Sequence, residues 1–200
     1  MNLVDPEGRK IGDPDELVMK FKQNIETKIK EIKDNHASLT SIGIDEKKLR
    51  QICEVYQAVL DELQFLEKSD DTFKIVNNIK EDGGITSWND GIILIEIGNK
   101  DDYGLIGHEL KHAYQFTQGE ISFNAINGGG GLLYDIHDEY DAFLRQAYIN
   151  AGINYEDDFK NYLNVLNKKY SNLNTQRCNI HTKGILEILY EIKDIFRTPK

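Results

Sequence analysis

Apolar residues recur at the spacing of an α-helix through the first third of the chain. A helix can begin near Asp13 or Asp15, where an acidic side chain caps free backbone N–H groups. Its apolar stripe consists of Leu17, Phe21, Ile25, Ile29 and Ile32. After a break over residues 35–43, a second helix begins near Asp45. Its core-facing positions are Leu49, Ile52, Tyr56, Val59, Leu60, Leu63 and Leu66. The pattern therefore predicts two amphipathic helices before residue 70.

The periodicity then shortens to that of β-strands. Residues 73–79 carry apolar side chains largely on one alternating face, and residues 81–84 are typical of a turn. A short extended piece follows at 85–88. Asn89-Asp90-Gly91 is a strong hairpin signal, because Asp-Gly tolerates the positive φ of a type I′ turn. The largely apolar run 91–97 then predicts a strand. We therefore expect a small antiparallel sheet placed between helices.

Helical periodicity returns after this sheet. Four helices are predicted near residues 101–117, 135–150, 155–170 and 181–196. The glycine run 128–131 lacks the Gly-Lys-Ser/Thr ending of a phosphate-binding loop, and a flexible rim or lid explains it better. The order of helices, hairpin sheet and helices predicts an α+β fold. We expect one domain over residues 15–200, preceded by a linker over residues 1–14.

The composition is that of a globular protein and narrows the functional classes. The chain has 200 residues, 40% of them hydrophobic and 29% charged. No run approaches the roughly 20 apolar residues of a membrane-spanning helix. The net charge of −10 argues against nucleic acid as a main partner, because phosphate binding needs a concentrated basic surface. The first residues lack the features of a signal peptide, so we expect a cytoplasmic chain or a piece of a larger exported protein.

The strongest chemical signal is the sequence His108-Glu109-Leu110-Lys111-His112 within a predicted helix. His108 and His112 are four residues apart, so on a helix they project from one face, one turn apart. Two imidazoles so placed can share a tetrahedral zinc ion and leave positions for a third ligand and a water molecule. Glu109 lies beside them and can act as the general base toward that water. The competing interpretation is a structural helix with two incidental histidines.

A third metal ligand has to come from elsewhere in the chain. The extended metzincin motif would need a glycine and a histidine where this chain has Gln115 and Gln118. The segment 134–146 offers five candidates, which are Asp135, His137, Asp138, Glu139 and Asp141. We favour Glu139, because Ala142 lies on the same helical face and would let two helices approach closely. The other four can also be explained as an acidic helix start, where negative charge is favourable.

A His-Glu-x-x-His helix followed by a helix with Glu-x-x-Ala resembles the gluzincin group of metallopeptidases. A closer resemblance rests on His-Glu-Leu-Lys-His-Ala-Tyr-Gln at 108–115 and Glu-Tyr-Asp-Ala-Phe-x-x-Gln at 139–146. Both are similar to the zincin-like metallopeptidase toxin domains that end Rhs-type polymorphic toxins. Residues 2–8, Asn-Leu-Val-Asp-Pro-Glu-Gly, resemble the Asp-Pro-x-Gly sequence that closes the Rhs core before a variable toxin domain. The zincin resemblance covers residues 85–150.

The resemblance implies a zinc-dependent metallopeptidase that hydrolyses peptide bonds. His108, His112 and Glu139 would bind Zn²⁺, and Glu109 would be the base. A hydrogen-bond donor would stabilise the oxyanion. The candidates are His181, which we favour, Tyr148 and Tyr134, and each also has a structural explanation. The strand at 92–97 would be an edge strand that pairs with an extended substrate, unless it is buried with no free edge.

The same resemblance implies a toxin or effector domain of a larger secreted protein. Its partners would be a protein or peptide substrate in the target cell and a cognate immunity protein. The leading alternative is a catalytically silent zincin-like module that binds a partner protein, and a further one is a structural or storage metal domain. Glu109 weighs against both alternatives, because a base beside the two histidines serves catalysis.

Overall fold

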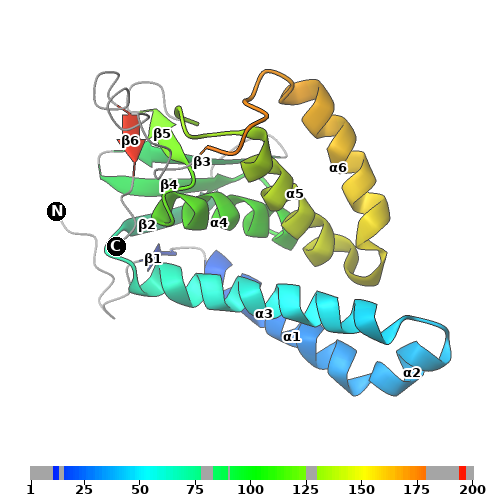
Figure 1. Ribbon diagram of the computed structural model, residues 1–200. Coiled ribbons are helices and arrows are strands. Elements are labelled where there is room, and N and C mark those ends of the chain that lie inside the picture. The colour runs from blue at the N-terminus through cyan, green and yellow to red at the C-terminus, as the bar shows by residue number, and fades with distance from the viewer. Residues whose placement is uncertain are drawn as a thin grey trace.

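The computed structural model describes residues 11–13, 16–77, 83–89, 91–124, 130–178 and 194–196. The Rhs-like segment at 2–8, the glycines Gly128 and Gly129, and His181 lie outside these residues. The described chain is an α+β structure in which helices pack against a small mixed sheet (Figure 1).

The two predicted amphipathic helices are confirmed. Helix α1 spans Leu17–Asp34 and helix α3 spans Glu46–Lys68, and both bury their apolar stripes in one core. Asp13 caps α1, because its carboxylate accepts hydrogen bonds from the first two N–H groups of the helix at 2.6 and 2.8 Å. Asp45 caps α3 in the same way. The expected break between them contains a short helix, α2, at His36–Ser41.

Four strands form one sheet in the order β1-β2-β4-β3. Their bounds are Ile11–Gly12 for β1, Thr72–Asn77 for β2, Gly84–Asn89 for β3 and Ile92–Ile97 for β4. The predicted hairpin joins β3 to β4. Asn89 pairs with Ile92 across the turn, and Gly91 has a φ of 86°, the left-handed conformation that glycine adopts without strain.

The expectation of an antiparallel sheet is wrong for most of this sheet. Strands β3 and β4 are antiparallel, but β2 runs parallel to both β1 and β4. The hairpin folds back so that β4 enters between β2 and β3. Ile93, Ile95 and Ile97 of β4 are almost fully buried, and a strand this apolar suits the interior of a sheet. The run 92–97 is therefore not an edge strand, and β3 is the described edge beside the site.

Three further helices cover the sheet and one another. Helix α4 (Tyr103–Thr117) lies against the sheet, α5 (Ile136–Ala151) lies beside α4, and α6 (Tyr155–Lys169) packs on the far side of α5 (Figure 1). A 3-10 turn at Gly152–Asn154 joins α5 to α6. None of the described helices has the length and apolar character needed to cross a membrane.

A second, smaller sheet consists of two strands. Strand β5 (Ser122–Asn124) runs antiparallel to β6 (Asp194–Phe196). The helix predicted over 181–196 is therefore wrong at its end, where pairing with β5 outweighs a local helical pattern. Residues 181–193 of that prediction lie outside the described residues.

Candidate metal centre

Helix α4 carries both histidines of the motif on its buried side. The helix begins after Asp102, whose carboxylate accepts a hydrogen bond from a first-turn N–H at 2.9 Å. His108 and His112 are 5% and 6% exposed. Their ring centroids lie 4.9 Å apart with the rings edge to face. The four-residue spacing thus brings two imidazoles together in a buried position, one helical turn apart.

Small residues bring α5 close to α4. A Cβ atom added at Gly104 or at Gly107 would lie 2.3 Å from a side-chain atom of α5. Ala142 of α5 is fully buried. A larger side chain at either glycine would push the two helices apart. The close packing brings Glu139, in the first turn of α5, to the two histidines of α4.

His108, His112 and Glu139 form a buried group that could hold a metal ion. The two Nε2 atoms lie 3.2 Å apart. Glu139 Oε2 lies 3.5 Å from His108 Nε2, and Glu139 Oε1 lies 3.5 Å from His112 Nε2. In a tetrahedral site with zinc–ligand bonds of about 2.0–2.1 Å, neighbouring ligand atoms are about 3.3–3.4 Å apart. The three observed separations fit such a site.

A glutamine sets the orientation of the His112 ring. Gln115 is fully buried, and its Nε2 donates a hydrogen bond to the Asp138 carbonyl at 3.1 Å. Its Oε1 therefore faces His112 Nδ1, 2.8 Å away, and accepts a hydrogen bond from that nitrogen. The Nε2 atom of His112 then faces His108 and Glu139, at 3.2 Å from His108 Nε2 and 3.5 Å from Glu139 Oε1. A partner of this kind fixes the tautomer of a metal-binding histidine.

Two buried polar atoms of the group have no hydrogen-bond partner among the described residues. They are His108 Nδ1 and Glu139 Oε2. Gln146 lies beside His108, and its Oε1 is also without a partner there. Because an unpaired buried polar atom is unfavourable, the free Oε2, which faces His108 Nε2, supports a cation between these side chains.

Burial and mutual contact push the pKa values of the two histidines apart. Burial, together with the neighbouring His112, lowers the pKa of His108 to about 3. Burial also works against charge on His112, but the hydrogen bond and the charge of Glu139 outweigh it and raise the pKa of His112 to about 9. The same contact holds the pKa of Glu139 below its ordinary value, against the effect of burial. Without a metal ion, the group thus favours one bound proton, carried by His112 beside the ionised Glu139.

Glu109 faces the same space from the adjacent position of α4. Its side chain is buried, at 4% exposed, and Thr86 Oγ1 lies 2.8 Å from its Oε2. Burial raises the pKa of Glu109 to about 7, although the charge of His112 and the hydrogen bond from Thr86 both oppose the rise. A carboxyl group with this pKa can take up and release a proton near neutral pH.

A cavity of about 190 Å³ opens onto these side chains. Its walls come from β3, β5, the segment before α5 and the end of α6. Tyr134 lines it, and its hydroxyl donates a hydrogen bond to Glu139 Oε1. Lys169 and Tyr170 line it from the end of α6. Burial and the charges of Glu139 and Glu109 raise the pKa of Tyr170, which keeps its hydroxyl protonated as a donor.

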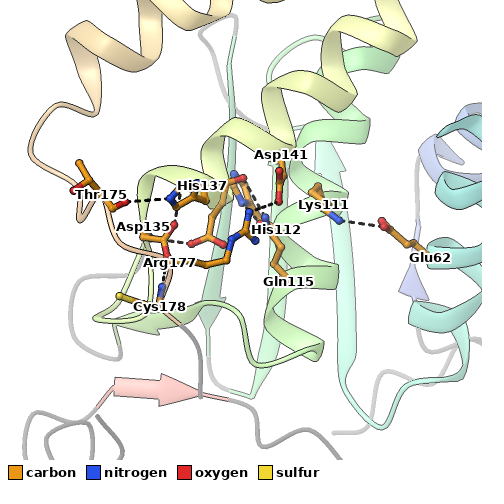
Figure 2. A network of polar contacts seen from close by, with 11 residues as sticks. Glu62, Lys111, His112, Gln115, Asp135, His137, Asp141, Thr175, Arg177 and Cys178 are labelled. Carbon is orange, nitrogen blue, oxygen red and sulfur yellow. Dashed lines mark hydrogen bonds and ion pairs between the residues drawn. The ribbon is translucent and has the colours of Figure 1, made fainter. Parts of the chain in front are cut away.

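The other four candidate ligands lie outside the His-His-Glu group, and three of them, Asp135, His137 and Asp141, contact the chain segment 174–178 instead. Asp135 and Asp138 form the capping box at the start of α5, and Asp135 also accepts a hydrogen bond from Cys178 N–H. His137 Nε2 lies 3.1 Å from the carbonyl oxygen of Thr175, and Asp141 pairs with Arg177 at 3.3 Å. Figure 2 shows the contacts of Asp135 with Cys178, of His137 with Thr175 and of Asp141 with Arg177. Burial raises the pKa of Asp138 to about 8, with the charge of Asp135 adding to the rise.

Of the predicted oxyanion donors, only Tyr134 lines the cavity among the described residues. The Tyr148 hydroxyl instead accepts a hydrogen bond from Gln51 Nε2 at 2.8 Å, and its ring stacks on Tyr155 with centroids 3.8 Å apart. His181 lies outside the described residues.

Sequence reasoning missed several residues of the site, three of them with polar side chains. Thr86, Lys169 and Tyr170 each line the cavity. Their residue types are common, and nothing in their spacing relates them to the motif on α4, so only the packing of β3 and α6 against α4 and α5 could identify them.

Comparison of the chain with protein-family models, with curated proteins and with solved structures finds no match. The site itself therefore carries the functional conclusion. It consists of two imidazoles and a carboxylate that could hold a metal ion, with a second buried carboxylate facing the same cavity.

Proposed function

We propose that this protein is a zinc metallopeptidase. The carrying observation is the group formed by His108, His112 and Glu139, whose ligand atoms lie 3.2 to 3.5 Å apart as a tetrahedral zinc site requires. The second support is Glu109, whose buried carboxylate faces the same cavity from the residue next to a histidine. A structural metal site has no use for such a carboxylate.

Zinc is the ion that this donor set suits, because two imidazole nitrogens and one carboxylate leave a fourth position for water. Bound there, zinc would acidify that water and polarise a substrate carbonyl. Glu139 Oε2, which has no partner among the described residues, faces His108 and is free to serve as a ligand.

Glu109 is the proposed general base. Its carboxylate accepts a proton from the attacking water and passes that proton to the leaving nitrogen of the peptide. A pKa raised to about 7 suits both steps, because both the protonated and the ionised carboxyl group are accessible near neutral pH. Tyr170, which lines the cavity and whose raised pKa keeps its hydroxyl protonated, is the proposed donor to the oxyanion.

The substrate is proposed to lie along β3. This strand is one of the two described edges of the sheet, and it borders the cavity through Gly84, Ile85 and Thr86. An exposed edge can pair with the backbone of an extended peptide, the role that the sequence suggested for the run 92–97. Ile85 is 49% exposed at this edge and would contact apolar side chains of the peptide.

The biological role that we propose is that of a toxin or effector domain of a larger secreted protein. It rests on the resemblance of residues 108–115, 139–146 and 2–8 to Rhs-type toxins. Expression inside a susceptible bacterial cell should then stop growth, and Glu109→Gln should relieve the arrest. Equal toxicity of the wild type and a folded, zinc-loaded Glu109→Gln protein would rule out hydrolysis as the harmful act.

The direct test uses purified protein. It should carry about one zinc ion per chain, as a single site predicts, and hydrolyse fluorescently labelled casein. Glu109→Gln should keep the zinc and the unfolding temperature but lose about 10²- to 10⁴-fold in rate, the usual contribution of a general base. A protein that binds zinc and cleaves nothing in a broad peptide library would instead be a binding module.

A further inference from the structure

Two residues of β3, Gly84 and Thr86, lie against the carboxylate of Glu109. Gly84 and Thr86 are two positions apart, so their side-chain positions share one face of the strand. That face packs on α4. The sequence pattern predicts no role for either residue.

Thr86 holds Glu109 at two points. Its Oγ1 lies 2.8 Å from Glu109 Oε2 and 3.0 Å from the main-chain oxygen of Glu109. Both oxygens belong to one residue, so the hydroxyl links the end of the side chain to its own helical turn. Thr86 is 7% exposed, so water competes little for these contacts. The Glu109 side chain, which would otherwise sample several rotamers, is thereby restricted.

Gly84 provides the space for the other carboxylate oxygen. A Cβ atom added there would lie 2.5 Å from Glu109 Cγ, 2.6 Å from Oε1 and 2.8 Å from Cδ. Gly84 is not among the described glycines with positive φ, so its backbone conformation does not demand glycine. The requirement is steric, and any side chain at this position would displace the carboxylate.

We propose that Thr86 and Gly84 are positioning residues that hold the Glu109 carboxylate in one orientation beside the His-His-Glu group. Thr86 fixes Oε2, and the bare backbone at Gly84 leaves Oε1 at the cavity. This inference rests on the proposed role of Glu109 as the base. It assigns to β3 a catalytic purpose that is separate from pairing with a substrate.

The first test removes only the hydroxyl. Thr86→Val should leave zinc content and unfolding temperature close to wild type, lower kcat for labelled casein about tenfold and leave KM unchanged, because one oriented hydrogen bond is lost. Thr86→Ser should restore kcat. Thr117→Val is the matched control, because Thr117 is equally buried and donates to a main-chain oxygen at 2.7 Å without touching the site.

A second readout does not depend on peptide hydrolysis. Acetohydroxamate chelates a metal ion through its oxygens and gives a hydrogen bond to a neighbouring carboxylate. Its affinity for the cobalt-loaded protein, measured by visible absorption, should fall about three- to tenfold in Thr86→Val, the value of one hydrogen bond, and recover in Thr86→Ser. In a Glu109→Ala background Thr86→Val should change nothing further. An equal loss in that background would mean that Thr86 acts elsewhere and would overturn the proposal.

Crystal structures complete the test and need no bound metal. Glu109 should occupy one conformer in the wild type and Thr86→Ser, and more than one in Thr86→Val. In Gly84→Ala the carboxylate should be displaced. A single unchanged Glu109 conformer in Thr86→Val and in Gly84→Ala would refute the positioning role, whether or not the protein proves to be a peptidase.

Discussion

Helices α3 and α4 are both buried along one side, but they bury different chemistry. The residues that α3 buries are Leu49, Ile52, Tyr56, Val59, Leu63 and Leu66. Helix α4 buries His108, Glu109, His112 and Gln115 among its apolar residues. Polar groups in the interior reduce stability unless each finds a partner. The buried face of α3 therefore stabilises the fold. The buried face of α4 forms a site at some cost in stability.

The contrast extends to how the polar groups are paired. Gln115 and Thr86 provide partners for His112 and Glu109. His108 Nδ1 and Glu139 Oε2 have none among the described residues. Helix α3 thus contributes mainly to stability, and α4 mainly to the site. Substitutions on α3 should lower the free energy of unfolding, whereas substitutions on α4 should mainly lower metal binding and activity.

The largest effect is expected from removing a metal ligand. Loss of a residue that hydrogen-bonds to a metal ligand typically weakens metal binding about 10- to 100-fold. Glu139→Ala should weaken zinc binding by more than this, because Glu139 faces both histidines. Asp141→Ala is the control, since Asp141 pairs with Arg177 outside the group. Competition with a chromophoric chelator measures both. A larger loss for Asp141→Ala would place the ion elsewhere on α5.

The second prediction compares the two helix surfaces directly. Ile52→Ala on α3 should lower the free energy of unfolding by about 2–5 kcal/mol, because Ile52 is fully buried among apolar neighbours. His108→Leu should leave the metal-free protein as stable as the wild type or more so. It replaces a buried imidazole whose Nδ1 is unpaired with an apolar side chain. Urea denaturation with a chelator present tests this, and strong destabilisation by His108→Leu would contradict it.

A smaller effect is expected at the glutamine behind His112. Gln115→Met keeps the volume and removes the hydrogen bond to His112 Nδ1, so zinc affinity should fall about 10- to 100-fold. Gln146→Met, at a residue whose Oε1 has no partner among the described residues, should weaken binding less. Isothermal titration of both variants with zinc shows which glutamine contributes more to zinc affinity. The reverse order would assign the orienting role to Gln146.

The smallest effect is the change in zinc affinity over a single pH unit. Between the pKa of His108 at about 3 and that of His112 at about 9, the metal-free group carries one proton. Zinc binding must displace that proton, so affinity should rise about tenfold per pH unit and fall on acidification. Chelator competition from pH 5 to about pH 7 gives the slope. An affinity independent of pH would show that His112 is already neutral before zinc binds.

Much of the local structure could be predicted from the sequence, because it depends on neighbours along the chain. The apolar stripes of α1 and α3, the cap at Asp13 and the hairpin between β3 and β4 all follow from residues close to one another in the chain. The placement of His108 and His112 on one buried face follows from their four-residue spacing.

Other features depend on contacts between distant segments. The sheet is mixed because β4 enters between β2 and β3, and β6 is a strand because it pairs with β5. The approach of Glu139 to the histidines depends on Gly104 and Gly107, which admit α5 against α4.

The available chemistry can be read from the motif alone: a pair of imidazoles one helical turn apart, with a carboxylate between them in the sequence. A helix imposes this geometry wherever it lies, because its rise and rotation per residue are constant. The packing of the helices selects Glu139 among the five candidate ligands, and it places Thr86, Gly84 and Tyr170 at the same cavity. Such choices rest on the close packing of helices and strands that are far apart in the chain, and no local periodicity encodes them.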